Sequence, residues 1–144
     1  MNRLDSLAPK FLSLLRVVAG LMFLEHGTQK ILHFPAPLPV GPAAAAAAAA
    51  AKAAGHGVSP IVTASGWIEL VGGALIALGL FTRSAAFICS GEMAVGYFIA
   101  HMPRSFFPVN SLGDAAVLYC FVFLYFVFSG PGPYALDAAL PKKA

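Results

Sequence analysis

The chain has 144 residues, which limits it to a single domain. Hydrophobic residues make up 59% of it and charged residues only 10%, against about 25% charged in an ordinary soluble domain. The mean hydropathy of +0.81 agrees with this balance. So few charges could not cover the surface of a soluble domain, so the composition indicates a membrane protein. The net charge is +3, but the nine Lys and Arg residues are scattered through loops and ends. That distribution favours topology determinants over a nucleic-acid partner.

The first predicted transmembrane helix covers about residues 11–32, between Pro9 and Pro35. Its apolar run is followed by Glu25 and His26 instead of a small-residue cleavage site, so we expect a retained helix and not a signal peptide. This helix is the most polar of the predicted spans, with five polar or charged residues within it or near its end: Arg16, Glu25, His26, Gln29 and Lys30.

A loop rich in Pro and Ala follows, at residues 34–60. Five prolines break any continuous helix there. The alanine run from Ala43 to Ala51, extended to Gly55, has high helix propensity but is too short to cross a bilayer. A short surface helix and an irregular excursion both stay open for this segment.

Three further apolar segments are long enough, or nearly so, to cross a membrane, at about residues 61–81, 83–101 and 112–129. With the first helix they predict an all-α fold, an integral membrane bundle of four transmembrane helices in one domain. If both termini lie on one side, that side holds five basic residues, namely Arg3, Lys10, Arg83, Lys142 and Lys143. The opposite side holds three, Lys30, Lys52 and Arg104. This bias predicts cytoplasmic termini.

Ionisable residues are predicted at several depths in the bilayer, since each helical residue rises about 1.5 Å. Glu69 and Glu92 fall near the midplane, and Arg16 lies in the inner half. The outer half holds Glu25, His26 and Asp114, and the outer mouth holds His101 and Arg104. A charged side chain at the centre of a membrane helix costs at least about 2.5–3.5 kcal/mol. The two glutamates are therefore expected to be protonated, paired or hydrated, with Arg16 and His26 as the available counter-charges.

Two interpretations of this polar set compete. Each residue could simply hold helices together by hydrogen bonds, which contribute about 0.6 kcal/mol on average. The whole set together favours a functional intramembrane cluster, made of Arg16, Glu25, His26, Glu69, Glu92 and Asp114. Gly66 and Gly73 share a helical face with Glu69, and such small residues allow the close helix packing that would bring the glutamates inward.

The cysteines and aromatic residues give weaker indications. Cys89 and Cys120 form neither a CxxC pair nor a metal-ligand spacing, so no metal site is predicted. Residues 112–129 are rich in Phe and Tyr. Such residues could line a site for a flat ring such as a quinone, although aromatic residues in membrane helices more often face lipid.

Several sequence pieces together resemble the DoxX family of small four-helix membrane proteins. They are Leu15-Arg16, the stretch from Phe23 to Lys30, Glu69 to Gly73, Leu78 to Arg83, Gly91 to Ala94, His101 to Arg104, Phe107 to Asn110, Gly113-Asp114 and Gly130 to Pro133. The resemblance implies a bacterial inner-membrane protein. The family is named after a subunit of a thiosulfate:quinone or quinol-oxidising system, and other members are tied to thiol redox homeostasis. The family's polar positions correspond to the six cluster residues named above, whereas the alanine-rich insert departs from its pattern.

Three functions are compatible with these features. The first is a redox-linked membrane subunit that binds a quinone or similar lipophilic ligand, with Glu69 and Glu92 as proton carriers and His26 as exchange partner. No haem or iron–sulfur ligation is visible, so electrons would come from the quinone or from a larger membrane redox complex. The second is a non-catalytic accessory or scaffolding subunit, acting through a larger complex or by self-association. The third, proton-coupled transport of a small solute, ranks last because four helices are few for such a pore.

Overall fold

The computed structural model describes residues 3–36, 41–53 and 59–139, and within them every regular element is helical. The predicted all-α fold is therefore confirmed. The elements in chain order are α1 (Arg3–Leu32), α2 (Pro42–Ala53), α3 (Pro60–Leu78), α4 (Thr82–Gly96), a π-helical turn η1 (Tyr97–His101), α5 (Pro108–Ser111), α6 (Asp114–Ser129) and α7 (Leu136–Ala139).

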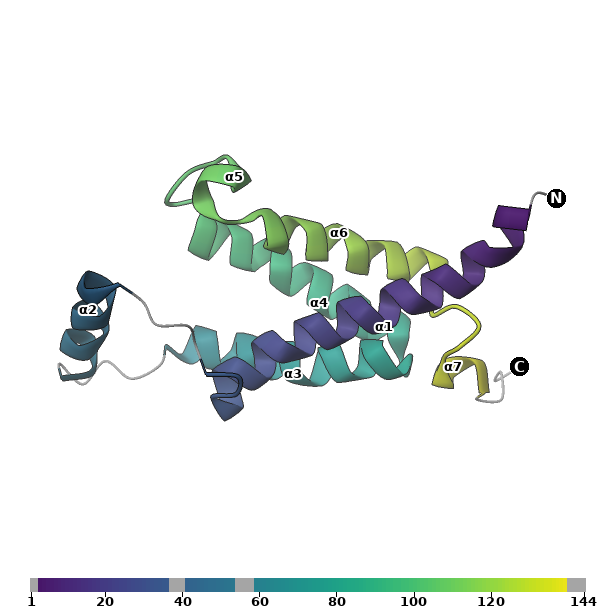
Figure 1. The fold of residues 1–144 in the computed structure, drawn as a ribbon, viewed down its shortest axis with the longest axis horizontal. Coiled ribbons are helices and arrows are strands. Elements are labelled where there is room, and N and C mark those ends of the chain that lie inside the picture. The colour runs from purple at the N-terminus through teal and green to yellow at the C-terminus, as the bar shows by residue number, and fades with distance from the viewer. Residues whose placement is uncertain (1–2, 37–40, 54–58, 140–144) are drawn as a thin grey trace.

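The four longer helical stretches of the bundle form two antiparallel pairs. Helix α1 packs along α3, and α4, continued by η1, packs along α6 (Figure 1). The pairs lie close together at the end that carries α7 and the turn between α3 and α4. They diverge toward the opposite end, where α2 and α5 lie (Figure 1). The two helix pairs thus form a wedge, and its closed end is the end at which the pairs lie close together (Figure 1). The described parts of both chain ends lie at this closed end (Figure 1).

Most helix boundaries lie within two residues of those expected, and the third span ends in the π-helical turn η1. Two boundaries differ by more. Helix α1 begins at Arg3 instead of residue 11, so Pro9 lies inside the helix, in its second turn, and does not mark its start. Helix α3 ends at Leu78 instead of residue 81, because Gly79 adopts the left-handed conformation, with φ of 70°. The N–H groups of Gly79 and Leu80 bond the carbonyls of Ile76 and Leu75, at 3.1 and 2.9 Å, which closes the helix.

The alanine-rich segment forms a short helix, which is one of the two alternatives that the sequence left open. Residues Pro42–Ala53 form a twelve-residue helix, α2, with proline at its first position. It lies apart from the four-helix bundle (Figure 1).

Within the part of the chain that the structure describes, two helices are long and apolar enough to cross a membrane, over Leu4–Leu32 and Pro60–Leu78. In each, only 28% of the most apolar window is buried, so most of the apolar surface faces outward. The core helix of a soluble protein would instead bury such a surface. Helix α6 is equally apolar in character but shorter, at 16 residues.

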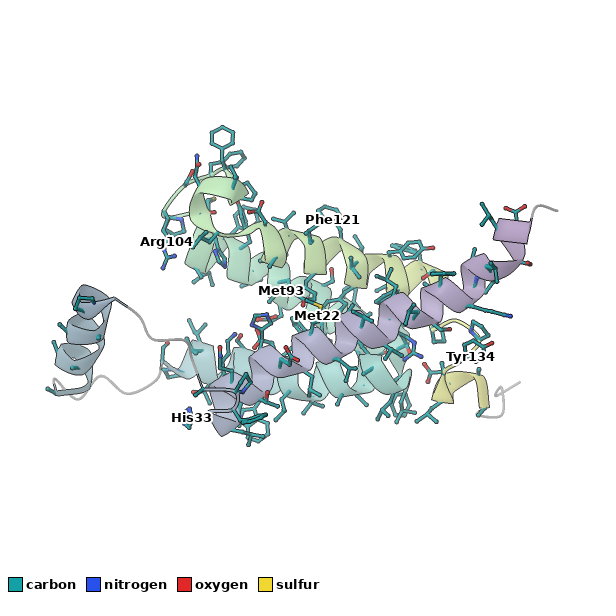
Figure 2. All side chains as sticks on the ribbon, viewed as in Figure 1. Met22, His33, Met93, Arg104, Phe121 and Tyr134 are labelled. Carbon is teal, nitrogen blue, oxygen red and sulfur yellow. The ribbon has the colours of Figure 1, made fainter. Side chains whose placement is uncertain are left out.

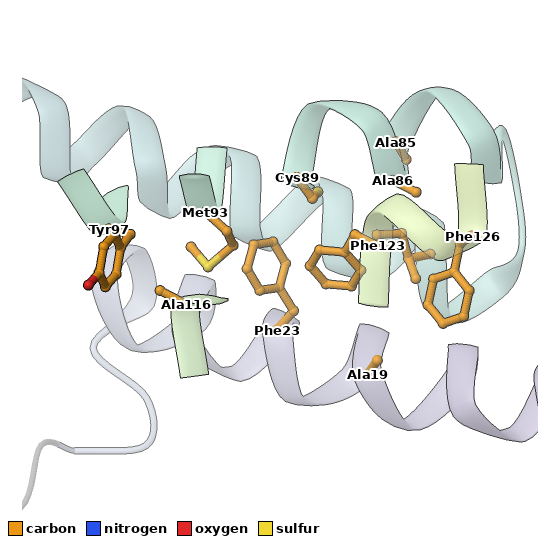
Figure 3. Packing of buried hydrophobic residues seen from close by; sticks show 11 residues of the cluster. Ala19, Phe23, Ala85, Ala86, Cys89, Met93, Tyr97, Ala116, Phe123 and Phe126 are labelled. Atoms are coloured by element: carbon orange, nitrogen blue, oxygen red, sulfur yellow. The ribbon is translucent and has the colours of Figure 1, made fainter. Parts of the chain in front are cut away.

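A row of buried side chains fills the space between α1, α4 and α6 (Figure 3). Phe23 of α1 contacts Phe123 of α6 edge-on, with ring centroids 4.8 Å apart. Phe126 continues the row toward the closed end, whereas Phe121 and Phe128 of the same helix are exposed. The aromatic residues of α6 are thus divided between the core and the outer surface.

Glycines bring α1 and α3 into backbone contact. A Cβ atom at Gly27 would lie 2.6 Å from the Leu70 Cα atom, and one at Gly73 would lie 2.6 Å from the Leu24 nitrogen. Both distances are too short for any other residue without separating the helices. The close packing predicted from Gly66 and Gly73 is therefore present, and α1 contributes glycines of its own to it.

Candidate functional site

A cavity of about 960 Å³ lies between the two helix pairs. All four long helices line it, together with η1 and the residues at the helix ends. Its walls are mostly apolar, and its ionisable side chains come from His26 and Lys30 of α1, Glu69 of α3, Glu92 of α4, His101 of η1 and Tyr119 of α6. Glu69 and Glu92, the two glutamates placed near the midplane from the sequence, both line this cavity.

Glu69 is held beside α1 by an ion pair. Its side chain is only 2% exposed, and its Oε1 atom lies 2.7 Å from the Lys30 Nζ atom. Gly66, on the same face of α3, makes room for this pair, because a Cβ atom there would lie 2.9 Å from the Lys30 Cβ atom. An ammonium this close compensates the cost of burying the carboxylate.

Ser65 links the ion pair to the second glutamate. Its hydroxyl accepts a hydrogen bond from the Lys30 ammonium at 2.8 Å and donates one to the Glu92 Oε1 atom at 2.9 Å. Ser65 precedes Glu69 by one helical turn, so both side chains leave the same face of α3. The result is a continuous polar network, Glu69–Lys30–Ser65–Glu92, across three helices.

Three buried polar atoms at this network have no hydrogen-bond partner within the described residues. They are the Oε2 atom of Glu69, the Oε2 atom of Glu92 and the hydroxyl oxygen of Tyr119. A buried polar atom left unpaired costs about 1–3 kcal/mol, more when it is charged. Two carboxylates against one ammonium also leave an excess of acceptor oxygens. The site is thus suited to a ligand that presents hydrogen-bond donors to carboxylate oxygens within an apolar cavity.

The structure brings only part of the predicted cluster together. Glu69, Glu92 and His26 line the cavity, whereas Glu25 and Asp114 are exposed and do not line it. At the predicted outer mouth, His101 lines the cavity and stacks on Tyr97, with its Nδ1 atom 3.0 Å from the Ser111 carbonyl oxygen. Arg104 is exposed, at the tip of the molecule near α5 (Figure 2), and lies outside the lining.

Arg16 lies away from the cavity, at the C-terminal end of α3, and its role there is structural. Its guanidinium is 1% exposed and donates to the carbonyls of Ile76 and Ala77, both at 2.6 Å, and of Pro131, at 2.8 Å. It also bonds the carbonyl of Tyr134, which lies beside α7 at the closed end (Figure 2). Arg16 therefore caps the C-terminal end of α3, where a positive charge is favourable, and is not the expected counter-charge of the glutamates.

Lys30 takes the role expected of Arg16. A sequence signal for it existed, because Phe23, His26 and Lys30 recur at intervals of three and four and therefore share a helical face. Ser65 and the cavity-facing position of Tyr119 had no comparable signal, since both depend on the way α3 and α6 pack against their neighbours.

Asp137 completes the closed end of the wedge. Its two carboxylate oxygens accept hydrogen bonds from the backbone N–H groups of Phe81 and Thr82, at 2.7 and 2.8 Å, where α4 begins. Burial by itself raises the pKa of the Asp137 carboxyl, but these hydrogen bonds and the positive charge of Arg16 hold that pKa below its ordinary value. The carboxylate thus acts as an N-terminal cap for α4.

The fold and the cavity define an all-helical membrane protein with a polar network buried between its helices. The DoxX family model matches residues 11–102, so the chain belongs to the DoxX family, as its sequence resemblance predicted. An uncharacterized protein of Haemophilus influenzae is 45% identical over 146 residues, covering 99% of this chain and all of the relative. An uncharacterized membrane protein of Mycobacterium tuberculosis is 31% identical over 143 residues, covering 90% of this chain and 81% of the relative. No solved structure matches the chain.

Proposed function

We propose that this DoxX family membrane protein binds a quinone, in its hydroxylated quinol form, or a similar lipophilic ring, as a redox-linked subunit. The observation that carries the proposal is the pair Glu69 and Glu92, joined through Lys30 and Ser65, each with one buried oxygen that lacks a partner among the described residues. The hydroxyl groups of a quinol donate hydrogen bonds, which such carboxylate oxygens can accept. The apolar walls and the ring of Tyr119 suit the ring's faces.

Each polar residue of the cavity has a separate role in this proposal. Lys30 balances the charge of Glu69, so that the ligand meets one compensated and one uncompensated carboxylate. Oxidation of a bound quinol to the quinone releases two protons and two electrons. Glu92 accepts the two protons one after the other, and the exposed His26 exchanges protons between the cavity and the outside. The two electrons pass to an acceptor in a larger membrane redox complex.

The membrane arrangement belongs to the same proposal. All four long stretches cross the bacterial inner membrane, with both termini in the cytoplasm. Helix α4 and η1 contribute 15 and 5 residues without a break, and at about 1.5 Å per residue these reach about 30 Å, the thickness of the hydrocarbon core. Helix α6 is the shortest span, and Gly113 and Gly130 flank it. In this arrangement the cavity opens toward the outer leaflet. The closed end, where Arg16 caps α3 and Asp137 caps α4, lies on the cytoplasmic side.

The proposal is tested by titrating the purified protein, in mild detergent, with a benzoquinol that carries a ten-carbon tail. Glu69→Gln and Glu92→Gln should each weaken binding by at least about ten-fold, because a hydrogen bond to a charged group contributes about 1.5–3 kcal/mol. Glu25→Gln is the matched control, since it removes the same charge from an exposed position that does not line the cavity. Its affinity should equal that of the unaltered protein.

Two results would count against the proposal. The first is no detectable binding of the benzoquinol to the unaltered protein. The second is an affinity for the benzoquinol that is the same in all three variants as in the unaltered protein. Absence of binding together with co-purification at fixed stoichiometry with a larger membrane enzyme would support the accessory-subunit function instead.

A further inference from the structure

One side of the cavity is an apolar groove between α3 and α4. Ile61 of α3 and Ile88, Val95 and Ile99 on the α4–η1 side line it, and all four are more than half exposed. Ile88, Val95 and Ile99 recur at intervals of seven and four and therefore form one continuous face. The groove offers hydrocarbon on both walls and is open to the surroundings of the protein.

The groove is closed at one end and polar at its base. A Cβ atom at Gly72 would collide with the Cys89 Sγ atom, which shows that α3 and α4 are in close contact there. Glu92 lies one turn beyond Cys89, directly where the helices begin to separate, and its Oε1 atom is bonded to Ser65 across the gap. The carboxylates therefore lie where the deep end of the groove meets the cavity.

The opposite side of the cavity, between α1 and α6, is different. There the ring of Tyr119 lies 5.4 Å from that of Phe23 and 6.3 Å from that of His26, centroid to centroid. These contacts bridge the two helices with aromatic rings, two of them polar. Among the described residues that line the cavity, the apolar path for a hydrocarbon chain therefore lies between α3 and α4.

We propose that the ligand is an amphiphile whose polar ring binds at Glu69 and Glu92 and whose hydrocarbon tail lies in the α3–α4 groove. This inference rests on the proposed function and adds the direction of entry, sideways from the hydrocarbon core of the bilayer. A tail in the groove keeps its contact with lipid, so the ligand need not be drawn out of the membrane to reach the carboxylates.

Gly91 provides the means to test the groove. It lines the cavity on α4 and is exposed, and a Cβ atom added there would meet nothing within 4 Å. A Phe side chain at this position starts from open space on α4 and can extend into the groove. Leu118 of α6, which is exposed and does not line the cavity, allows a Phe substitution at a helix outside the groove.

The experiment measures the affinity of two probes, the benzoquinol ring without a tail and the same ring with a ten-carbon tail. Gly91→Phe should weaken binding of the tailed probe at least about ten-fold and change that of the tailless ring less than about two-fold. Leu118→Phe should leave both affinities unchanged. All proteins are compared in the same mild detergent, after each is shown to be monodisperse.

Different failures have different meanings. If Gly91→Phe leaves the tailed probe unaffected, or Leu118→Phe weakens it instead, the tail does not lie between α3 and α4 and the inference is wrong. If Gly91→Phe weakens both probes equally, position 91 belongs to the ring site and the inference is again wrong, although the proposed function stands. If neither probe binds the unaltered protein, the proposed function itself fails, and the inference fails with it.

Discussion

The glycine contacts between α1 and α3 make a quantitative prediction about Gly27. A Cβ atom at this position would lie 2.6 Å from the Leu70 Cα atom and 2.8 Å from the Glu69 carbonyl carbon. These are backbone atoms, which cannot turn aside as a flexible side chain could. Gly27→Ala must therefore push α1 and α3 apart.

The magnitude follows from two opposing effects. Overpacking a close contact costs about 1–3 kcal/mol. Replacing a mid-helix glycine by alanine stabilises the helix by about 0.5–1 kcal/mol. Gly27→Ala should therefore lower the free energy of unfolding by about 1 kcal/mol, within a range of about 0–2.5 kcal/mol. Gly91→Ala, in the middle of α4 with nothing within 4 Å of the new methyl group, should raise it by about 0.5–1 kcal/mol.

The two variants form a matched pair, since each adds one methyl group to a glycine inside a long helix. Reversible unfolding in mixed micelles with increasing SDS measures the free energy difference. Gly27→Ala should also weaken ring binding, because the displaced α1 carries Lys30 away from Glu69. Equal stability changes in the two variants, or a stabilised Gly27→Ala, would refute the backbone contact described here.

Three further predictions concern the closed end and the topology. Arg16→Met removes every hydrogen bond that the buried guanidinium donates, and it should destabilise the protein by about 3 kcal/mol. The affinity of the folded fraction for the benzoquinol should stay unchanged. A weakened affinity would place Arg16 at the ligand site. Asp137→Asn should cost about 0.5–2 kcal/mol at neutral pH in the same unfolding assay. Because the pKa of Asp137 is lowered by folding, its ionised form stabilises the protein above its unfolded pKa of about 3.9, and this stabilisation is lost as the pH falls further through the folded pKa. The variant should lack that loss; an unchanged pH profile would contradict the capping role. A reporter enzyme that is active only outside the cytoplasm, fused after Ala144, should be inactive; activity there would reverse the proposed orientation.

The polar residues show how far a sequence pattern carries a site prediction. Depth along a helix follows from residue number and rise alone, so Glu69 and Glu92 could be placed at similar depths without any structure. Their helical face could also be estimated, because glycines at intervals of three and four from Glu69 indicate close packing there. Neither argument gives the rotation of one helix against another. That rotation decides that Glu25 is exposed while Glu69, at the neighbouring α3, is buried.

Arg16 illustrates the same limit from the opposite direction. A buried arginine and two buried glutamates suggest an ion pair when only composition and depth are known. The fold instead places the guanidinium at the end of α3, where unpaired carbonyls satisfy it, and gives the glutamate a lysine from the other end of α1.

The sequence by itself determined the all-helical class, the membrane environment and the DoxX family, because composition, apolar run length and local motifs are properties of the chain in order. It also determined which residues are costly enough in lipid to need partners. Only the tertiary structure decided which partners they have. The link from Lys30 through Ser65 to Glu92 joins residues 27 to 39 positions apart. The pairing of α1 with α3 and of α4 with α6, and the divergence that opens the cavity, likewise depend on contacts between distant parts of the chain, which no local pattern encodes.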